Sequence, residues 1–142
     1  MARIVFDLPP HFGFDTEVQV YINHVNYGGH LDNALLLTLV SEARVRFFRA
    51  LGYAENDVGG LPIVVGDVLA QYRSEAFYGE QLRIAMQPTD LSRCAFDLAW
   101  RVTESSQGRE VARGKHGIVF TDPATHRAAS IPQAVRAQLL AL

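Results

Sequence analysis

The sequence of 142 residues contains only one cysteine, Cys94. A single thiol cannot form an internal disulfide and cannot by itself make a metal site, so the composition gives no sign of redox chemistry. No window approaches the roughly 18 consecutive apolar residues that a membrane helix needs, and the N-terminus lacks the basic start and apolar run of a secretion signal. We therefore expect a soluble, cytoplasmic protein.

The sequence also lacks a large excess of positive or negative charge, because it contains 13 Lys and Arg residues and 15 Asp and Glu residues. The basic residues are scattered along the chain, whereas a nucleic-acid-binding protein usually concentrates them on one element. The charge pattern argues against a nucleic-acid partner and fits a small acidic or neutral substrate.

Internal repeats, low-complexity tracts and interdomain linkers are not visible in the sequence, and the Gly and Pro residues fall where turns are expected. A chain of this length with 49% hydrophobic residues can bury most of its apolar surface in one compact unit. We expect a single domain over residues 1–142.

Two elements are predicted in the first third of the chain. Between Thr16 and Asn23, apolar and polar residues alternate, which is typical of a half-buried strand. Residues 34–51 contain no Gly or Pro and form too long a run for a strand, so they predict a helix capped by Asp32 or Asn33 and ended by Gly52. Apolar residues surround this helix almost completely, which indicates a buried helix.

The rest of the chain predicts consecutive strands at 63–73, 81–87, 93–103 and 110–121, followed by a short helix at 132–142. The simplest arrangement that buries both the strands and the apolar helix is an α+β fold, with one antiparallel sheet wrapped around one long buried helix. A single sheet of this kind leaves strand edges uncovered, and pairing of two subunits would cover them.

The loop between the first strand and the helix is the most polar and glycine-rich part of the chain. It contains Gly28 and Gly29 together with six polar residues: His24, Asn26, Tyr27, His30, Asp32 and Asn33. Two glycines permit a close approach of the backbone to a ligand, and the helix start offers unpaired N–H groups and a positive dipole end. These features outline a site for an oxyanion, although a plain strand-to-helix turn with a capping residue would have the same composition.

Residues 24–33, His-Val-Asn-Tyr-Gly-Gly-His-Leu-Asp-Asn, resemble the signature Asp-x-Asp-x-x-Gly-His-Val-x-Asn of the 4-hydroxybenzoyl-CoA thioesterase branch of the hotdog superfamily. The stretches 42–44, 51–53 and 72–82 are also similar to segments of that family. The resemblance implies a hotdog fold, hydrolysis of an acyl-CoA or acyl-carrier-protein thioester, and a homodimer or homotetramer. It implies neither a metal ion nor a cofactor, since coenzyme A would be part of the substrate.

The chain departs from the signature at Asn26, where much of the family has the Asp that serves as nucleophile or general base. A carboxamide cannot take a proton from water. His30 is then the best candidate for the base, because imidazole titrates near neutral pH. Glu42 is the second candidate if it is buried, and the alternative for it is an i,i+4 ion pair with Arg46.

In the mechanism that we expect, N–H groups near Asn33 polarise the thioester carbonyl while Asn26 and His30 position and activate water. The other substrate-binding residues would be Tyr27, Gly28, Gly29 and Asp32, with Asp32 a cap or an orienting group for His30. Four basic residues are available for the phosphates of coenzyme A: Arg73, Arg93, Arg113 and Lys115.

Two other functions compete with thioester hydrolysis. The stretch His30-Leu31-Asp32 resembles part of the hotdog enoyl-CoA hydratase signature, although the acidic residue upstream is missing. The loss of the base at Asn26 is also compatible with a non-catalytic module that binds acyl-CoA or acyl-carrier protein without turnover.

Overall fold

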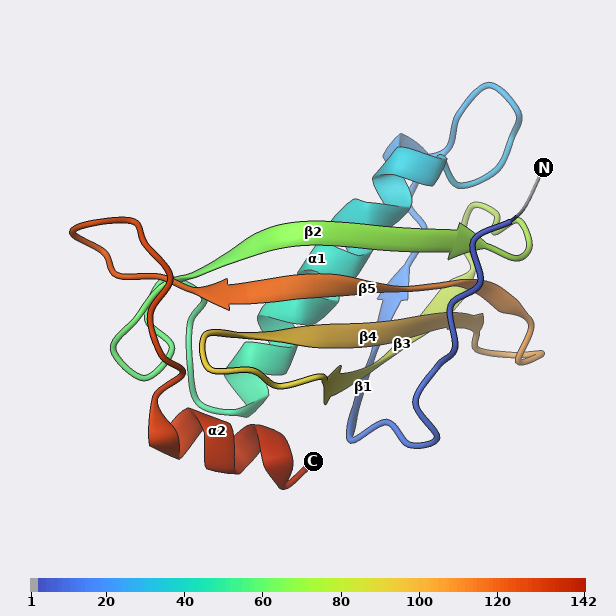
Figure 1. Ribbon diagram of the computed structural model, residues 1–142. Coiled ribbons are helices and arrows are strands. Elements are labelled where there is room, and N and C mark those ends of the chain that lie inside the picture. The colour runs from blue at the N-terminus through green and yellow to red at the C-terminus, as the bar shows by residue number, and fades with distance from the viewer. Residues whose placement is uncertain (1–2) are drawn as a thin grey trace.

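The computed structural model describes residues 3–142. In chain order, the elements are β1 (Phe14–Gln19), the 3₁₀ turn η1 (Ile22–His24), α1 (Asn33–Ala50), β2 (Ile63–Tyr72), β3 (Gln81–Thr89), β4 (Ala95–Glu104), β5 (Glu110–Phe120) and α2 (Gln133–Leu140). The five strands form one antiparallel sheet in the order β1-β3-β4-β5-β2, and α1 lies across it (Figure 1). This arrangement confirms the predicted fold class.

The first strand differs from its prediction. It begins at Phe14 and ends at Gln19, whereas alternation predicted a strand from Thr16 to Asn23. The chain instead turns into η1, where the Tyr21 N–H donates to Nδ1 of His24 at 3.0 Å and the His24 N–H donates to the Tyr21 carbonyl oxygen at 3.0 Å. These local bonds satisfy backbone groups that a longer strand would have paired with a neighbour.

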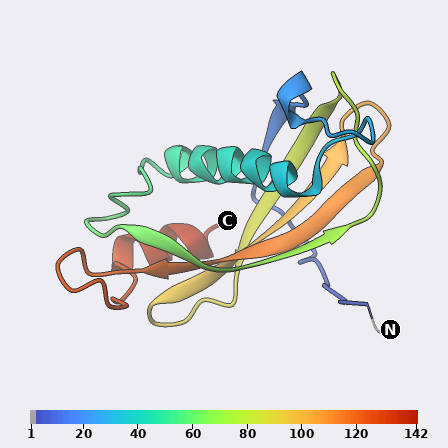
Figure 2. The same cartoon turned by 90° about the horizontal axis from the view of Figure 1, so that it is seen from above.

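Helix α1 begins and ends as its capping signals predict. Asp32 is the N-cap, and Gly52 follows the helix with a φ of 95°, in the left-handed region that favours glycine. The sheet curves around one side of the helix (Figure 2), where six residues are buried: Leu36, Leu39, Val40, Ala43, Phe47 and Phe48. The apolar pattern continues beyond this side, and Val45 remains 39% exposed.

Aromatic side chains hold α1 against the sheet. Phe47 contacts Phe14 of β1 edge to face, with ring centroids 5.6 Å apart, and Phe48 contacts Phe96 of β4 at 6.5 Å. Phe96 in turn contacts Phe120 of β5 at 6.3 Å. Such aromatic pairs stabilise the core by more than the burial of their apolar area alone. This row of aromatic contacts therefore fixes the position of the helix over the sheet.

An arginine side chain links α1 to β5 by hydrogen bonds within the same core. Arg44 of α1 donates from Nε to Glu55 at 2.7 Å and from Nη1 to Nδ1 of His116 in β5 at 3.0 Å. Because a guanidinium only donates, Nδ1 of His116 must accept and therefore carries no proton. Burial, and secondarily the charge of Arg44, lower the pKa of His116 to about 4. The imidazole is 2% exposed and neutral near pH 7.

The two edges of the sheet are unlike each other. Strand β1 has six residues, and its Asp15 and Glu17 side chains pair with Arg83. Strand β2 has ten residues, and Val64, Val68 and Tyr72 are each nearly half exposed on it. A long edge strand with exposed apolar side chains is the kind that proteins usually cover.

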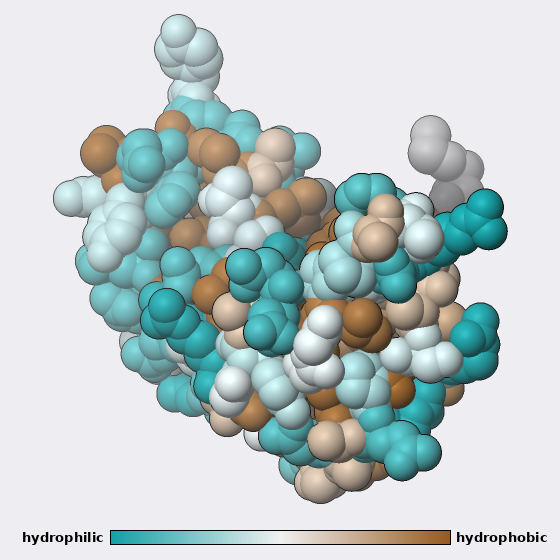
Figure 3. Space-filling view, turned by 90° about the vertical axis from the view of Figure 1, so that its left-hand side faces the viewer, coloured by the Kyte–Doolittle hydropathy of each residue, from teal (hydrophilic) through white to brown (hydrophobic). Residues whose placement is uncertain are grey.

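Exposed apolar side chains also occur outside β2, among them Val5, Ile22 and Tyr78. Residues 3–13 cross the sheet face opposite α1 (Figure 2), where Gln71 donates to the Ile4 carbonyl oxygen at 2.9 Å. At the end of the molecule where β2 begins and β5 ends, apolar residues appear in small groups between hydrophilic ones (Figure 3). No helix in the described part of the chain is long and apolar enough to cross a membrane.

The neutral state of His116 predicts a pH-dependent stability. Its pKa is lowered in the folded protein, so the unfolded chain binds more protons between about pH 6.5 and pH 4, and stability falls as the pH decreases through this window. The total loss should be about 3 kcal/mol. In His116→Gln the amide oxygen can still accept from Arg44 but does not titrate, so urea unfolding at pH 7 and pH 4.5 should show a smaller loss. Equal losses in both proteins would contradict this account.

Candidate active site

The polar loop before α1 is a compact turn held by its own backbone. The Asn26 N–H donates to the His30 carbonyl oxygen at 3.1 Å, and the Gly29 N–H donates to the Asn26 carbonyl oxygen at 3.0 Å. The side-chain oxygen of Asn26 accepts from the Gly28 N–H at 2.9 Å. This last bond orients the carboxamide, so its NH₂ group is left to donate to other partners.

The two glycines of the loop are needed for different reasons. Gly29 has a φ of 80°, which favours glycine, and a side chain there would meet open space. Gly28 has no such backbone conformation, but a Cβ at this position would lie 3.0 Å from Nε2 of His30 and 3.2 Å from Oδ1 of Asn26. The side chains of His30 and Asn26 therefore flank the same small space, which only a glycine leaves open.

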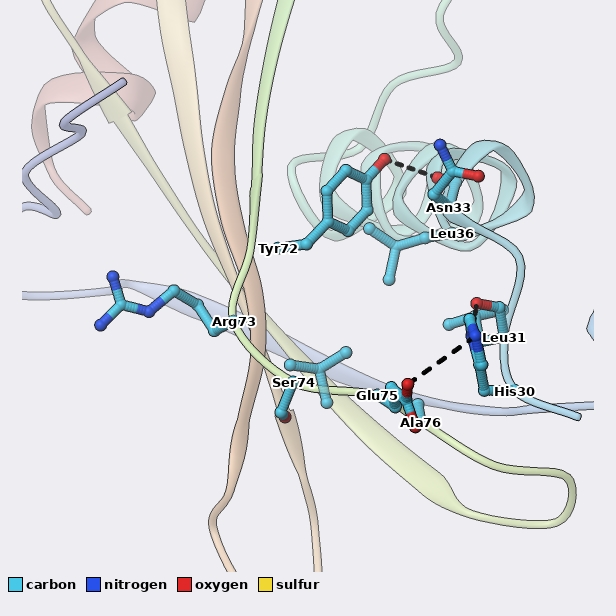
Figure 4. A pocket seen from close by; sticks show the side chains of 10 residues that line it. His30, Leu31, Asn33, Leu36, Tyr72, Arg73, Ser74, Glu75 and Ala76 are labelled. Atoms are coloured by element: carbon cyan, nitrogen blue, oxygen red, sulfur yellow. Dashed lines mark hydrogen bonds and ion pairs between the residues drawn. The ribbon is translucent and has the colours of Figure 1, made fainter. Parts of the chain in front are cut away.

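His30 has a defined orientation. Its Nδ1 lies 3.1 Å from the Leu31 carbonyl oxygen, which can only accept, so Nδ1 carries the proton in the neutral ring. Nε2 is then the basic nitrogen, and it lies 3.8 Å from Oε1 of Glu75. Figure 4 shows the imidazole and this carboxylate facing each other.

Two backbone bonds place the loop against its neighbours. The Leu31 N–H donates to the carbonyl oxygen of Ala76, between β2 and β3, at 2.7 Å, and the Asp32 N–H donates to the His24 carbonyl oxygen at 2.8 Å. The first bond joins segments that are far apart in the sequence. It brings His30 beside Glu75, which precedes Ala76.

The N–H groups at the start of α1 differ in their hydrogen bonding. The carboxylate of Asp32 accepts from the N–H groups of Ala34 and Leu35 at 2.9 and 3.2 Å. Within residues 3–142, the Asn33 N–H makes no hydrogen bond. An unpaired N–H at a helix start, where the dipole is positive, can stabilise a developing negative charge.

Tyr72, the last residue of β2, touches this helix start. Its hydroxyl donates to the Asn33 carbonyl oxygen at 2.6 Å (Figure 4). Although the residue as a whole is 48% exposed, partial burial and the nearby Asp32 carboxylate raise the pKa of the hydroxyl above its usual value. The hydroxyl therefore keeps its proton and remains a donor.

A pocket of about 320 Å³ lies between these segments. Its polar wall carries His30 and Asn33 from the loop and helix start and Tyr72, Ser74 and Glu75 from the end of β2 and the residues after it (Figure 4). The apolar residues of its wall are Leu31, Leu36, Ala76 and Val111. The arrangement places His30 and Asn33, the residue with the unpaired N–H, beside a space that an apolar group can fill.

The other predicted residues lie around the pocket or away from it. Gly28 and Asn26 border the space beside His30, but Asn26 lines a neighbouring shallow pocket with Tyr27 and Asp32. Tyr27 is fully exposed. Glu42 lines a different pocket with His24 and forms an ion pair with Arg46 at 3.0 Å, which was the structural alternative for this residue.

Tyr72, Ser74 and Glu75 were not predicted as site residues. They belong to the stretch 72–82, which resembles a family segment in sequence, but its local pattern does not show that it meets the loop at His30. The hydrogen bond between Tyr72 and Asn33 joins residues 39 positions apart.

Three of the basic residues considered for phosphates already have partners. Arg113 donates to Glu110 at 2.6 Å, Lys115 donates to Asp97 at 3.0 Å, and Arg93 donates to Ser130 at 2.9 Å. Arg73 lies beside the pocket, but its guanidinium points away from it (Figure 4). Over the described residues 3–142, no group of three or more His, Cys, Asp or Glu side chains is arranged to hold a metal ion.

Comparison with known proteins identifies relatives of this fold. The model of the thioesterase-like superfamily matches residues 20–139. The structure is similar to Slr0204, a 1,4-dihydroxy-2-naphthoyl-CoA thioesterase from Synechocystis, with a TM-score of 0.83 and 18% identity over 91% of this chain and 96% of that one. It is also similar to a thioesterase from Thermus thermophilus in complex with coenzyme A and Zn, with a TM-score of 0.76 and 22% identity over 91% and 98% of the two chains.

A protein of Aquifex aeolicus (strain VF5), named as a candidate esterase, is 24% identical over 108 residues, which cover 75% of this chain and 77% of that protein. At these identities the structural likeness shows the hotdog fold.

Proposed function

Because the chain belongs to the thioesterase-like superfamily, we propose that it hydrolyses acyl thioesters in the pocket between the start of α1 and the end of β2. One observation carries this proposal: His30 and the helix start at Asn33, with its free N–H, line the same partly apolar pocket. Hydrolysis needs a base for water and a donor for the carbonyl oxygen, and these two groups supply them.

The proposed reaction begins when Nε2 of His30 takes a proton from water and the water oxygen attacks the thioester carbonyl carbon. The Asn33 N–H stabilises the oxyanion that forms on the carbonyl oxygen. The carbon–sulfur bond then breaks, and the imidazolium returns its proton to the departing sulfur, which leaves as a thiol while the acyl group leaves as an acid. The Asn26 NH₂ group, oriented by its bond from Gly28, is placed to hold the water but cannot take its proton.

The proposed substrate is an acyl-CoA or an acyl-carrier-protein thioester. The similar thioesterase from Thermus thermophilus is in complex with coenzyme A, which supports a coenzyme A substrate for this chain too. The apolar wall of the pocket suits the acyl group. The reaction as proposed uses neither a metal ion nor a cofactor, and a cytoplasmic location remains a prediction.

Hydrolysis is tested by incubating the protein with acyl-CoAs from aromatic to long-chain and detecting free thiol. We expect turnover by the natural sequence and a loss of about 10²- to 10⁴-fold in kcat for His30→Gln, which lacks the base. The matched control is His11→Gln in the N-terminal segment, which should keep full activity. Turnover unaffected by His30→Gln would refute His30 as the base, and binding of acyl-CoA without turnover would identify a non-catalytic acyl-binding module instead.

Gly28→Ala tests whether the space between His30 and Asn26 is part of the site. The methyl group would lie 3.0 Å from Nε2 of His30, so the imidazole or the carboxamide must move, while the backbone needs no positive φ. Misplacement of this size should lower kcat by about 10- to 100-fold. The thermal unfolding temperature of Gly28→Ala should change little. Activity equal to that of the natural sequence would show that the reaction does not use the space between His30 and Asn26.

We also propose a homodimer in which the β2 edges of two copies pair. The β2 edge is long and exposes Val64, Val68 and Tyr72, although it also carries Asp67, whereas the β1 edge is short and bears Asp15 and Glu17. Pairing of β2 with itself would cover Val68 and would place the second copy beside Tyr72, which also lines the pocket. A tetramer would need a further interface.

Light scattering at micromolar concentration should give twice the mass of the 15.7 kDa chain. Val68→Glu should shift the protein toward the monomer, because it places a charge in the proposed interface. Leu140→Glu is the matched control, since Leu140 is 67% exposed on α2, which lies away from β2 (Figure 1), and it should leave the dimer intact. A monomeric natural sequence would disprove the dimer.

A further inference from the structure

We infer that Glu75 is a positioning residue for His30 that supplies, from another part of the chain, the negative charge that Asn26 cannot supply. This inference rests on the proposed thioester hydrolysis. The observation behind it is the pairing of Oε1 of Glu75 with Nε2 of His30 across 3.8 Å at the wall of the pocket.

The other carboxylates around the pocket have different partners. Asp32 accepts from the N–H groups at the start of α1. Glu80 accepts from Arg109 at 2.9 Å and from the Phe77 N–H at 2.7 Å. Within residues 3–142, His30 is the one ion-pair partner of Glu75, so this carboxylate alone is directed at the basic nitrogen.

The backbone on both sides keeps this pair together. The Leu31 N–H donates to the Ala76 carbonyl oxygen, which fixes the residues after His30 and after Glu75 relative to each other. The carbonyl oxygen of Glu75 accepts from Arg109 at 3.1 Å. Arg109 thus holds the main chain of Glu75, and the positive charge of Arg109 is paired with the carboxylate of Glu80.

The chemical consequence follows from the orientation of His30. The bond to the Leu31 carbonyl oxygen keeps the proton on Nδ1, so the proton from water must arrive at Nε2, on the side of Glu75. The imidazolium formed in that step is stabilised by the nearby negative charge. The side chains of His30 and Glu75 are 31% and 62% exposed, and a bound acyl thioester that excludes water would strengthen the interaction.

The test compares Glu75→Gln, Glu75→Asp and Glu75→Ala with the natural sequence in thioester hydrolysis. Glu75→Gln should lower kcat about tenfold and leave KM nearly unchanged, because the charge acts on the step that forms the imidazolium. Glu75→Asp should recover part of the loss. Added acetate should partly restore Glu75→Ala, since the site of the carboxylate is open to solvent.

Glu17→Gln is the matched control, because it removes the same charge from an exposed ion pair on β1 and should keep full activity. Full activity of Glu75→Gln would overturn the role of Glu75 but would leave the proposed hydrolysis standing. Loss of activity in Glu75→Gln without recovery by either aspartate or acetate would show a structural role and would overturn it as well. An inactive natural sequence would overturn the proposed function together with this role.

Discussion

The hydrogen bond from the Leu31 N–H to the Ala76 carbonyl oxygen, 2.7 Å long, is the contact on which the site depends. It joins the loop before α1 to the connection between β2 and β3, and residues from both segments line the pocket. His30 lies in the loop and Asn33 begins α1, whereas Tyr72 ends β2 and Glu75 lies in the connection that follows it. Without this bond, the Asn33 N–H and the His30 imidazole would lack the pocket wall that Tyr72 and Glu75 form opposite them.

The distribution of carboxylates explains how the site can work with Asn26 at the position where an Asp is expected. Asp32 is engaged at the helix start and Glu42 is paired with Arg46, so neither is directed at the pocket. Glu75 occupies the opposite wall and faces the basic nitrogen of His30. In this account the proton passes to an imidazole, and the negative charge that favours this transfer lies on a different segment from the one that carries the family signature.

Local signals in the sequence predicted the local features of the site. The capping role of Asp32, the helix end at Gly52 and four of the five strands follow from patterns within a few residues. The alternation of apolar and polar residues from 16 to 23 predicted too long a strand, because hydrogen bonds of His24 form a turn in its second half. The positions of Tyr72 and Glu75 depend on contacts between distant segments, which alternation and capping residues do not encode. Glycine content alone also could not show that Gly28 is required for space and Gly29 for its backbone conformation.

The central claim is that the thioester carbonyl binds between the start of α1 and His30. A crystal structure with a non-hydrolysable acyl-CoA analogue, in which a thioether or an amide replaces the thioester, tests it most directly. The account predicts the carbonyl oxygen of an amide analogue within hydrogen-bond distance of the Asn33 N–H, and the acyl group against Leu36 and Val111. An acyl group bound instead in the pocket beside His24 and Glu42 would contradict it.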